Sequence, residues 1–231
     1  MSSLTTPICP PTTISSWTAE YTAMSSDPLT AIVSALGKEQ IIPDVVPATH
    51  AFTPSVLFSI IYPNGAEVNL GNEMTVEETQ DEPEIRLAAL NGPWDDAPEA
   101  SYTLVMLDPD APYRTDAIYR SFRHWVITGL KSPAVASNSA EALNALKTHP
   151  STTPYRPPGP RPNSGIHRYT FLLFQEPTGP EPFTVPHGAP EYGAALEERR
   201  SWDAVAFAEK HELKLVGANY FLVTSPEVAT G

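Results

Sequence analysis

Apolar residues occur along this chain mainly in short runs, and polar segments that contain proline separate the runs. The runs are rich in β-branched and aromatic residues, which favour strands over helices. Strands are predicted over residues 55–62, 66–70, 83–90, 102–107, 122–130, 169–175 and 220–224. Asn64-Gly65 separates the first two runs, and both residue types tolerate the positive φ of a tight hairpin turn. Because the 26 prolines fall largely between the runs, we predict a mostly β domain with long ordered loops.

A helix is predicted to begin at Asp27-Pro28, where an N-cap residue type precedes a proline suited to the first turn. Its apolar face consists of Ile32, Val33 and Leu36. Gly37 is a natural helix stop. Residues 41–46 are predicted to form a short extended link to the first strand.

Two further helices are predicted over residues 139–147 and 201–211, the second with Ser201 as its N-cap. Residues 148–164 are rich in proline and lack an apolar period. A connection of this length inside a compact domain is usually functional or disordered. Residues 1–26 are rich in Ser, Thr and Pro and are predicted to form a flexible N-terminal arm, which leaves residues 27–231 as a single domain.

The composition is that of an ordinary soluble protein, with 41% hydrophobic and 18% charged residues. A net charge of −13 argues against nucleic acid as a partner and against adsorption to an acidic membrane. Cys9 is the single cysteine, so an intrachain disulfide is excluded and a reducing compartment is favoured. We expect no secretory signal and no transmembrane segment, and therefore a cytoplasmic protein.

Two aspartates flank a proline where the run 102–107 ends. Alternate residues of an extended chain face the same way, so Asp108 and Asp110 are expected to point into one cavity. Carboxylates that share a cavity repel each other, which raises one pKa and lets the pair act as acid and base. The alternative is that they accept backbone hydrogen bonds and hold the turn, the commoner role for an isolated Asp-Pro-Asp triplet.

Two histidines lie beside apolar runs. His124 is inside residues 122–130, where a lone histidine more often has a structural role, and His167 follows Gly165, which permits close backbone approach. The ligand spacings typical of metal sites are missing, so no metal is predicted. Ser164 lies near His167 in sequence, but that alone does not make a catalytic dyad, and there is no GxSxG motif. Without GxGxxG or GxxxxGK, no cofactor is predicted.

Taken in order, these segments resemble the signature of the phosphatidylethanolamine-binding protein family. Residues 108–112, DPDAP, match its first motif, and residues 165–169, GIHRY, match its second motif, GxHRY. Tyr119-Arg120 and His124-Trp125 match the strand that follows the first motif. The similarity runs from about residue 36 to about residue 224. Residues 42–45, 70–72 and 213–221 are most similar to fungal members, the group that includes carboxypeptidase Y inhibitors.

The resemblance implies a β-sandwich with a large antiparallel sheet and a few peripheral helices. It also implies a pocket that binds phosphate and related anions, including phospholipid headgroups. Carried over by position, the pocket residues are Asp108, Asp110, Pro112, His124, His167 and Tyr169. The backbone at Gly165 and the side chain of Arg161 are added as further ligand contacts. The Ala111–Pro112 bond is expected to be cis, as it often is in the family.

The loop before the second motif departs from the family pattern Tyr-x-Gly-Pro-x-Pro-Pro. Pro157 replaces a glycine and cannot donate a backbone hydrogen bond, while Arg156 and Arg161 add positive charge at the rim. We expect the ring N–H groups of both histidines and the backbone near Gly165 to hold a phosphate. A carboxylate would orient a histidine, and a carboxylate would also receive the ammonium of a zwitterionic headgroup.

Two functions from different classes follow. The first is a binding protein for a small anionic ligand or phospholipid headgroup, which regulates or inhibits a protease or kinase through its surface or its arm. The second is a fungal secondary-metabolite enzyme that cyclises or dimerises carboxylate or anhydride substrates of the maleidride type. In that enzyme His124, His167 and Asp110 would be the acid–base groups, and Arg161 or Arg168 would hold a carboxylate. A scaffold with a vestigial pocket is the third and least favoured interpretation.

Overall fold

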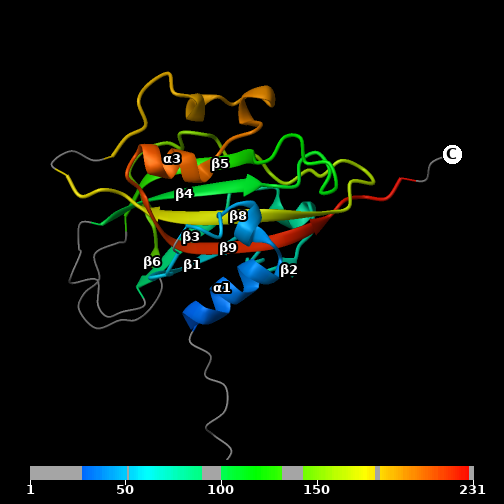
Figure 1. Cartoon of the computed structure of the whole chain (residues 1–231), viewed down its shortest axis with the longest axis horizontal. Helices are drawn as coiled ribbons and strands as arrows, with labels where there is room; N and C mark the ends of the chain where they lie inside the picture. Colours follow the sequence, from blue (N-terminus) through cyan, green and yellow to red (C-terminus); the bar gives the residue numbers. More distant parts are fainter. Residues whose placement is uncertain (1–27, 51, 90–99, 132–142, 180–182, 229–231) are drawn as a thin grey trace, which may run out of the picture.

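The computed structural model describes residues 28–50, 52–89, 100–131, 143–179 and 183–228. Within these ranges the chain is mostly β, with a large sheet, a small sheet and three α-helices (Figure 1). The predicted fold class is therefore confirmed. The proposed arm, residues 1–26, lies outside the described residues, and the division into an arm and one domain stays a prediction. No helix in the described ranges is long and apolar enough to cross a bilayer.

The large sheet has six strands, and its central four are long and antiparallel. In spatial order they are β2 (Asn72–Glu73), β9 (Lys214–Thr224), β8 (Ile166–Gln175), β4 (Ser101–Asp108), β5 (Phe122–Lys131) and β7 (Leu146–Lys147). The short β2 pairs with β9 in the parallel sense. Because neighbours run in opposite directions, the end of β4 lies beside the starts of β5 and β8, at the right in Figure 1.

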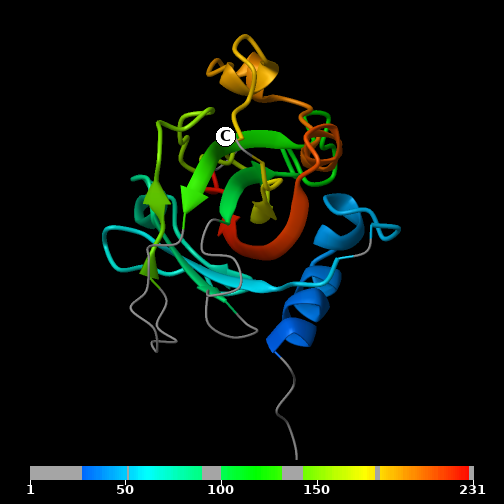
Figure 2. The ribbon, with the colours of Figure 1, turned by 90° about the vertical axis from the view of Figure 1, so that its left-hand side faces the viewer.

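The small sheet packs against one face of the large sheet. Its strands are β1 (Val56–Ile61), β3 (Glu84–Ala89) and β6 (Leu143–Asn144), in that order and antiparallel. Alternate residues of β1 are buried, as expected for a strand with one face on a core. Figure 2 shows the large sheet between the small sheet, in cyan, and the helix α3 (Ala204–Lys210), in orange.

Two apolar cores lie on opposite faces of the large sheet, and the period of two along β8 separates them. Tyr169, Phe171 and Leu173 belong to the core between the sheets. Leu172 and Phe174 belong to the core under the helices α1 (Pro28–Lys38), α2 (Ile41–Asp44) and α3. The same alternation decides on which side each polar side chain at the start of β8 lies.

Most predicted strands are confirmed, and β9 is longer than predicted because its first half lies buried between β8 and β1. The strand predicted over residues 66–70 is wrong: Glu67 makes an isolated bridge to Ile61, and the hairpin around Gly65 goes no further. Residues 41–44 form α2 rather than part of an extended link. The helix predicted to begin at Asp27-Pro28 is confirmed as α1, although it does not stop at Gly37 and ends at Lys38.

The helix predicted over residues 139–147 is wrong for the described part, residues 143–147. These residues are divided between β6 and β7, because Leu143 pairs with β3 and Leu146 pairs with β5. Pairing with distant strands thus overrides local propensity. Helix α3 is confirmed, but Asp203 caps it by accepting hydrogen bonds from the N–H groups of Val205 and Ala206.

Candidate functional site

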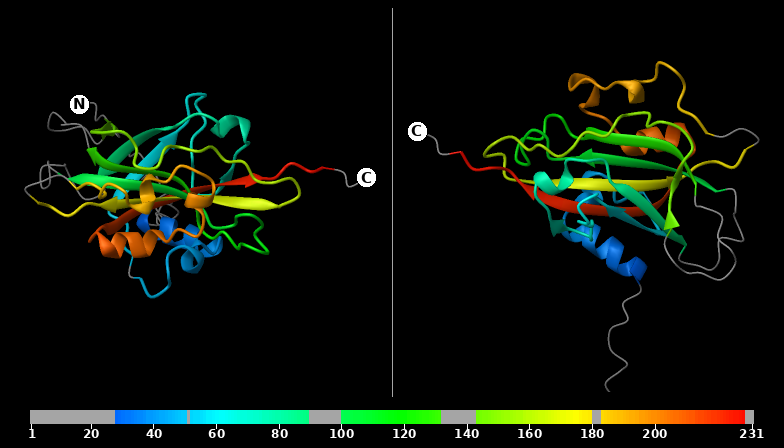
Figure 3. Two further views of the ribbon diagram at one scale, coloured as in Figure 1. Left: turned by 90° about the horizontal axis from the view of Figure 1, so that it is seen from above. Right: turned by 180° about the vertical axis from the view of Figure 1, so that it is seen from behind.

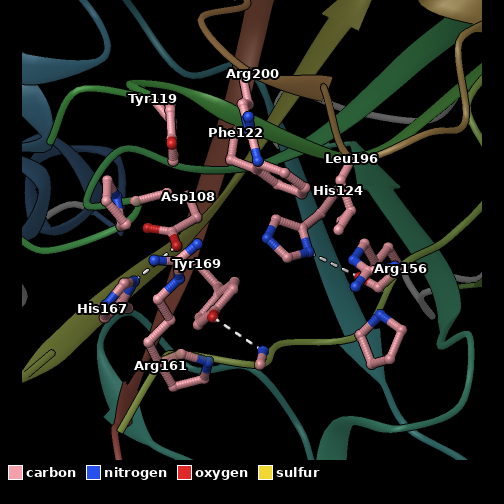
Figure 4. Close-up of a pocket in the computed structure, with 15 residues that line it drawn as sticks. Asp108, Tyr119, Phe122, His124, Arg156, Arg161, His167, Tyr169, Leu196 and Arg200 are labelled. Carbon is pink, nitrogen blue, oxygen red and sulfur yellow. Dashed lines mark hydrogen bonds and ion pairs between the residues drawn. The ribbon is translucent and has the colours of Figure 1, made fainter. Parts of the chain in front are cut away.

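A pocket of about 200 Å³ lies at the end of the large sheet where β4 ends and β5 and β8 begin (Figure 4). Six of the predicted ligand-binding residues line it: Asp108, Pro112, His124, Arg161, His167 and Tyr169. The Ala111–Pro112 bond at its wall is cis, as expected. Arg156 also lines it, as predicted. The sequence interpretation missed Tyr119, Leu196 and Arg200, which also line it.

Asp108 and His167 form a buried pair on the wall. The Nδ1 atom of His167 lies 2.7 Å from Oδ2 of Asp108, and the other carboxylate oxygen accepts the backbone N–H of Asp110 at 2.8 Å. Both side chains are at most 5% exposed. Asp108 therefore orients His167, as predicted for one of the two aspartates, and each of its oxygens already has a donor.

Ser164 extends this pair into a Ser–His–Asp chain that the sequence did not predict. Its Oγ lies 2.9 Å from Nε2 of His167 and 2.6 Å from the carbonyl oxygen of Arg161. A carbonyl can only accept, so the hydroxyl of Ser164 donates its proton to the Arg161 carbonyl. That proton does not point at Nε2 of His167, as it would have to in a catalytic serine–histidine pair. The chain acts as an anchor for the turn before β8.

The prediction that both carboxylates face one cavity is wrong for Asp110. The chain turns directly after Asp108, so the alternation of the strand no longer applies to Asp110. Its carboxylate, fully buried, binds the guanidinium of Arg168 at 2.6 and 2.9 Å and the backbone N–H of Arg168 at 2.9 Å. Asp110 therefore holds β8 and does not line the pocket.

Arg168 lies on the opposite face of β8 from His167. It is fully buried and also donates to the Glu39 carbonyl at 2.7 Å and to Asp44 at 2.9 Å. Arg168 therefore cannot hold a carboxylate substrate in the pocket. Of the two arginines that the enzyme hypothesis offered for this role, Arg161 is the one that lines the pocket. The backbone N–H of Gly165 is also unavailable, because it donates to the hydroxyl of Ser225 at 2.9 Å.

A β-bulge turns His124 into the pocket. Met106 pairs with Trp125 and Leu107 with Arg123, so the register of β5 against β4 skips His124. The extra residue locally changes the alternation and places the ring near Phe122 and Tyr169. No period-two argument from the sequence could have found this.

The ring of His124 is neutral and presents an acceptor. Its Nδ1 donates to the carbonyl oxygen of Arg156 at 2.8 Å. Burial lowers its pKa to about 4 against the opposing effect of Asp108, with Arg199 and Arg156 contributing. Nε2 therefore carries a lone pair, and Figure 4 shows it turned toward the centre of the pocket. The expectation that His124 donates to a phosphate is wrong at neutral pH, because its one proton is already used.

Tyr169 supplies a neutral donor at the floor of the pocket. Its hydroxyl oxygen accepts the backbone N–H of Gly159 at 3.3 Å, which leaves the hydroxyl proton for a ligand. Burial, followed by the nearby Asp108 carboxylate, raises its pKa well above the usual value, so the phenol stays protonated. Its ring stacks on Phe221 with centroids 5.2 Å apart, which fixes its position.

Three arginines surround the opening. Arg156 and Arg161 come from the proline-rich loop before β8, and Arg200 lies over the Tyr119 ring at 4.2 Å (Figure 4). No hydrogen bond or ion pair to another described residue occupies the guanidinium groups of Arg156 and Arg161. Arg200 has only a long contact, 3.7 Å, with the exposed Glu197. The loop thus brings positive charge to a chain with a net charge of −13.

Two buried arginines hold the segment that delivers Arg200. This segment, with η3 (Pro190–Tyr192) and η4 (Glu197–Arg199), runs beside β5 in Figures 1 and 3. Arg123 donates to the carbonyls of Pro190, Gly193 and Glu198. Arg199 donates to those of Arg123, His124, Pro154 and Ala194. Burial and the charges of Arg123 and Arg156 lower the pKa of Arg199 to about 10.

The described residues contain no cluster of three His, Cys, Asp or Glu side chains that could hold a metal ion. The wall combines three guanidinium groups, a phenol donor and a hydrogen-bonded His–Asp pair. Guanidinium and phenol groups are hydrogen-bond donors, and the guanidinium groups also carry positive charge.

Comparisons with known proteins point to one family. Residues 64–221 match the family described as phosphatidylethanolamine-binding protein. A Saccharomyces cerevisiae protein named YLR179C is 33% identical over 86% of this chain and 96% of its own length. The carboxypeptidase Y inhibitor of the same yeast is 29% identical over 83% of this chain and 94% of its own length.

Two solved structures are similar over most of this chain. Carboxypeptidase Y inhibitor complexed with its cognate proteinase has a TM-score of 0.71 and 26% identity, over 87% of this chain and 98% of that one. A phosphatidylethanolamine-binding protein from Plasmodium vivax has a TM-score of 0.61 and 25% identity, over 84% of this chain and 97% of that one.

Proposed function

The chain belongs to the phosphatidylethanolamine-binding protein family, and on that basis we propose that it is a binding protein that holds a small phosphate-type anion at the end of its large sheet. The observation that carries this proposal is the charge of the pocket. Three arginines face it, while its single acidic residue, Asp108, has both oxygens engaged. A guanidinium fork matches phosphate oxygens in geometry and charge.

Calorimetric titration with inorganic phosphate tests this proposal. The wild type should bind saturably, and an Arg156→Gln/Arg161→Gln double variant should bind about tenfold more weakly or worse, because charge-assisted hydrogen bonds are lost. Arg114→Gln is the matched control, since Arg114 pairs with Glu39 at 3.7 Å and does not line the pocket. Equal affinity of the double variant and the wild type would overturn the proposal.

A second function, inhibition of a carboxypeptidase, is favoured by the likeness to carboxypeptidase Y inhibitor over nearly all of that protein. The full chain should inhibit carboxypeptidase Y in a peptidase assay, and a variant that begins at Pro28 tests whether residues 1–27 carry the effect. Unchanged turnover at a large excess of the full chain would exclude this partner. The kinase partner and the secondary-metabolite enzyme are supported by none of these relatives and stay predictions.

A further inference from the structure

We propose that the pocket selects a small ligand with two anionic groups, a phosphate monoester that carries a second acid group, and discriminates against the zwitterionic phosphorylethanolamine headgroup. This inference deepens the proposed anion-binding function and rests on it. It reverses the expectation from the sequence that a carboxylate would receive an ammonium group.

The wall offers an ammonium group no free acid. Asp108 is the one acidic residue among those that line the pocket, and its oxygens accept from His167 at 2.7 Å and from the backbone of Asp110 at 2.8 Å. Asp110 is fully buried against Arg168 on the other side. An ammonium in the pocket would therefore have to share Asp108 with His167 while it faces three arginines, and like charges repel.

An aromatic ring face can also bind an ammonium group. The ring of Tyr119 lies in the wall, but the guanidinium of Arg200 already lies over it, with Cζ 4.2 Å from the centroid. Tyr169 packs on Phe221 with centroids 5.2 Å apart and meets His124 edge-on at 5.1 Å. Both tyrosine rings thus have partners of their own, which weakens this second route.

The arginines approach from different sides, which suits two anionic groups. Figure 4 shows Arg161 on the side of His167 and Asp108, Arg156 beside His124, and Arg200 above Phe122. One acid group can bind Arg161 and the Tyr169 hydroxyl, and the other can bind Arg156 and Arg200. The lone pair on Nε2 of His124 can accept from a ligand hydroxyl, including that of a singly protonated phosphate.

The size of the cavity and the net charge of the protein favour a free small molecule over a lipid as the source of this ligand. The cavity is about 200 Å³, and the net charge of −13 opposes approach to an acidic membrane. Vesicles that contain phosphatidic acid should not pellet the protein. Saturable binding to them would overturn the soluble-ligand part of the inference.

Three ligands that share a phosphate and differ in the charge of a short tail provide the test. Calorimetry should rank 2-phosphoglycolate, with a carboxylate, above ethyl phosphate, with a neutral tail, and ethyl phosphate above phosphorylethanolamine. We expect at least about a tenfold span between the first and the last, the effect of one lost charge-assisted contact. Phosphorylethanolamine binding as tightly as ethyl phosphate, or tighter, would overturn the inference. Failure of all three to bind would overturn the proposed function as well.

Arg200→Gln tests whether the preference for a second acid group depends on Arg200, which would bind that group together with Arg156. The affinity ratio of 2-phosphoglycolate to ethyl phosphate should fall toward one in this variant, because the tail carboxylate loses a partner. Arg114→Gln should keep the wild-type ratio. Circular dichroism should show that the Arg200→Gln variant is folded. If its affinity ratio is then the same as that of the wild type, Arg200 is excluded as a specificity residue.

Discussion

Asp108–His167 and Asp110–Arg168 are two acid–base pairs made from neighbouring residues, and they have different surroundings. The first pair lies in the wall of the pocket. The second pair is fully buried on the other face of the large sheet, where Arg168 also ties β8 to the α1–α2 region through Glu39 and Asp44. Consecutive residues of a strand point to opposite faces, and the turn after β4 sends the two aspartates to the matching sides.

The comparison shows that neighbouring residues within each of the two short motifs have different physical roles. His167 and its aspartate shape a surface that a ligand can reach, whereas Arg168 and its aspartate join the sheet to the helical layer. A sequence comparison that treats all the motif residues as ligand contacts merges these roles. The following predictions separate them.

Asp110→Asn should have the largest effect of these substitutions, a loss of unfolding free energy. The substitution leaves the buried guanidinium of Arg168 without its main counter-ion, which typically costs about 3–5 kcal/mol of unfolding free energy. Urea denaturation measures the loss. Glu84→Gln, in the exposed Glu84–Arg86 pair at 3.6 Å, is the control and should cost less than about 1 kcal/mol. Equal costs at the two sites would contradict the anchoring role.

His124 sharpens the comparison, because it is a buried base on the pocket wall without a carboxylate partner of its own. Its pKa is about 4 in the folded protein and about 6.5 in an unfolded chain. As the pH falls from about 6.5 to about 4, the unfolded chain gains a proton that the folded protein does not. The free energy of unfolding should therefore fall across this window, by about 3 kcal/mol in total.

His124→Gln should remove that part of the acid sensitivity, which urea denaturation at several pH values would measure. The matched control is His187→Gln, which removes an exposed histidine that stacks on Tyr192. If the slope of unfolding free energy against pH is the same in His124→Gln and the wild type, His124 is not held neutral by the fold.

Asp108→Asn should cost less stability than Asp110→Asn, about 1.5–3 kcal/mol, since one charge-assisted hydrogen bond to His167 becomes a neutral one. The more specific result is expected from nitrogen NMR of the imidazole ring. In the wild type, Nδ1 of His167 should carry the proton that Asp108 accepts, and this tautomer should no longer be fixed in the variant. A wild-type ring without a proton on Nδ1 would contradict the hydrogen bond to Asp108.

The sequence predicted the parts of the molecule that depend on local periodicity and on motif order. The central strands and the pocket residues Asp108, His167 and Tyr169 are of this kind. It could not predict the bulge that turns His124, because an extra residue in the register depends on how β5 pairs with β4. It also could not predict Asp110, because strand alternation ends at the turn.

The positions of residues that reach the pocket from a distant part of the sequence could not be predicted from local patterns. Arg200 reaches the pocket because Arg199 and Arg123 bind backbone carbonyls of segments that are distant in sequence. Ser201 is not the helix cap, because its φ of 53° is left-handed, whereas Asp203 has the extended backbone of an N-cap and caps α3. These outcomes follow from tertiary contacts that no window of the sequence contains.

Ser164→Ala should have the smallest effect, and it tests whether the Ser–His–Asp chain is an anchor or a catalytic device. As an anchor, Ser164 contributes ordinary hydrogen bonds to His167 and to the Arg161 carbonyl, so the variant should lose about 1 kcal/mol of stability. Because Arg161 is positioned by the same turn, phosphate affinity should also weaken, by a factor of a few. Hydrolysis of an activated ester by the wild type that disappears in Ser164→Ala, with little change in stability, would instead make Ser164 a nucleophile and refute its role as an anchor.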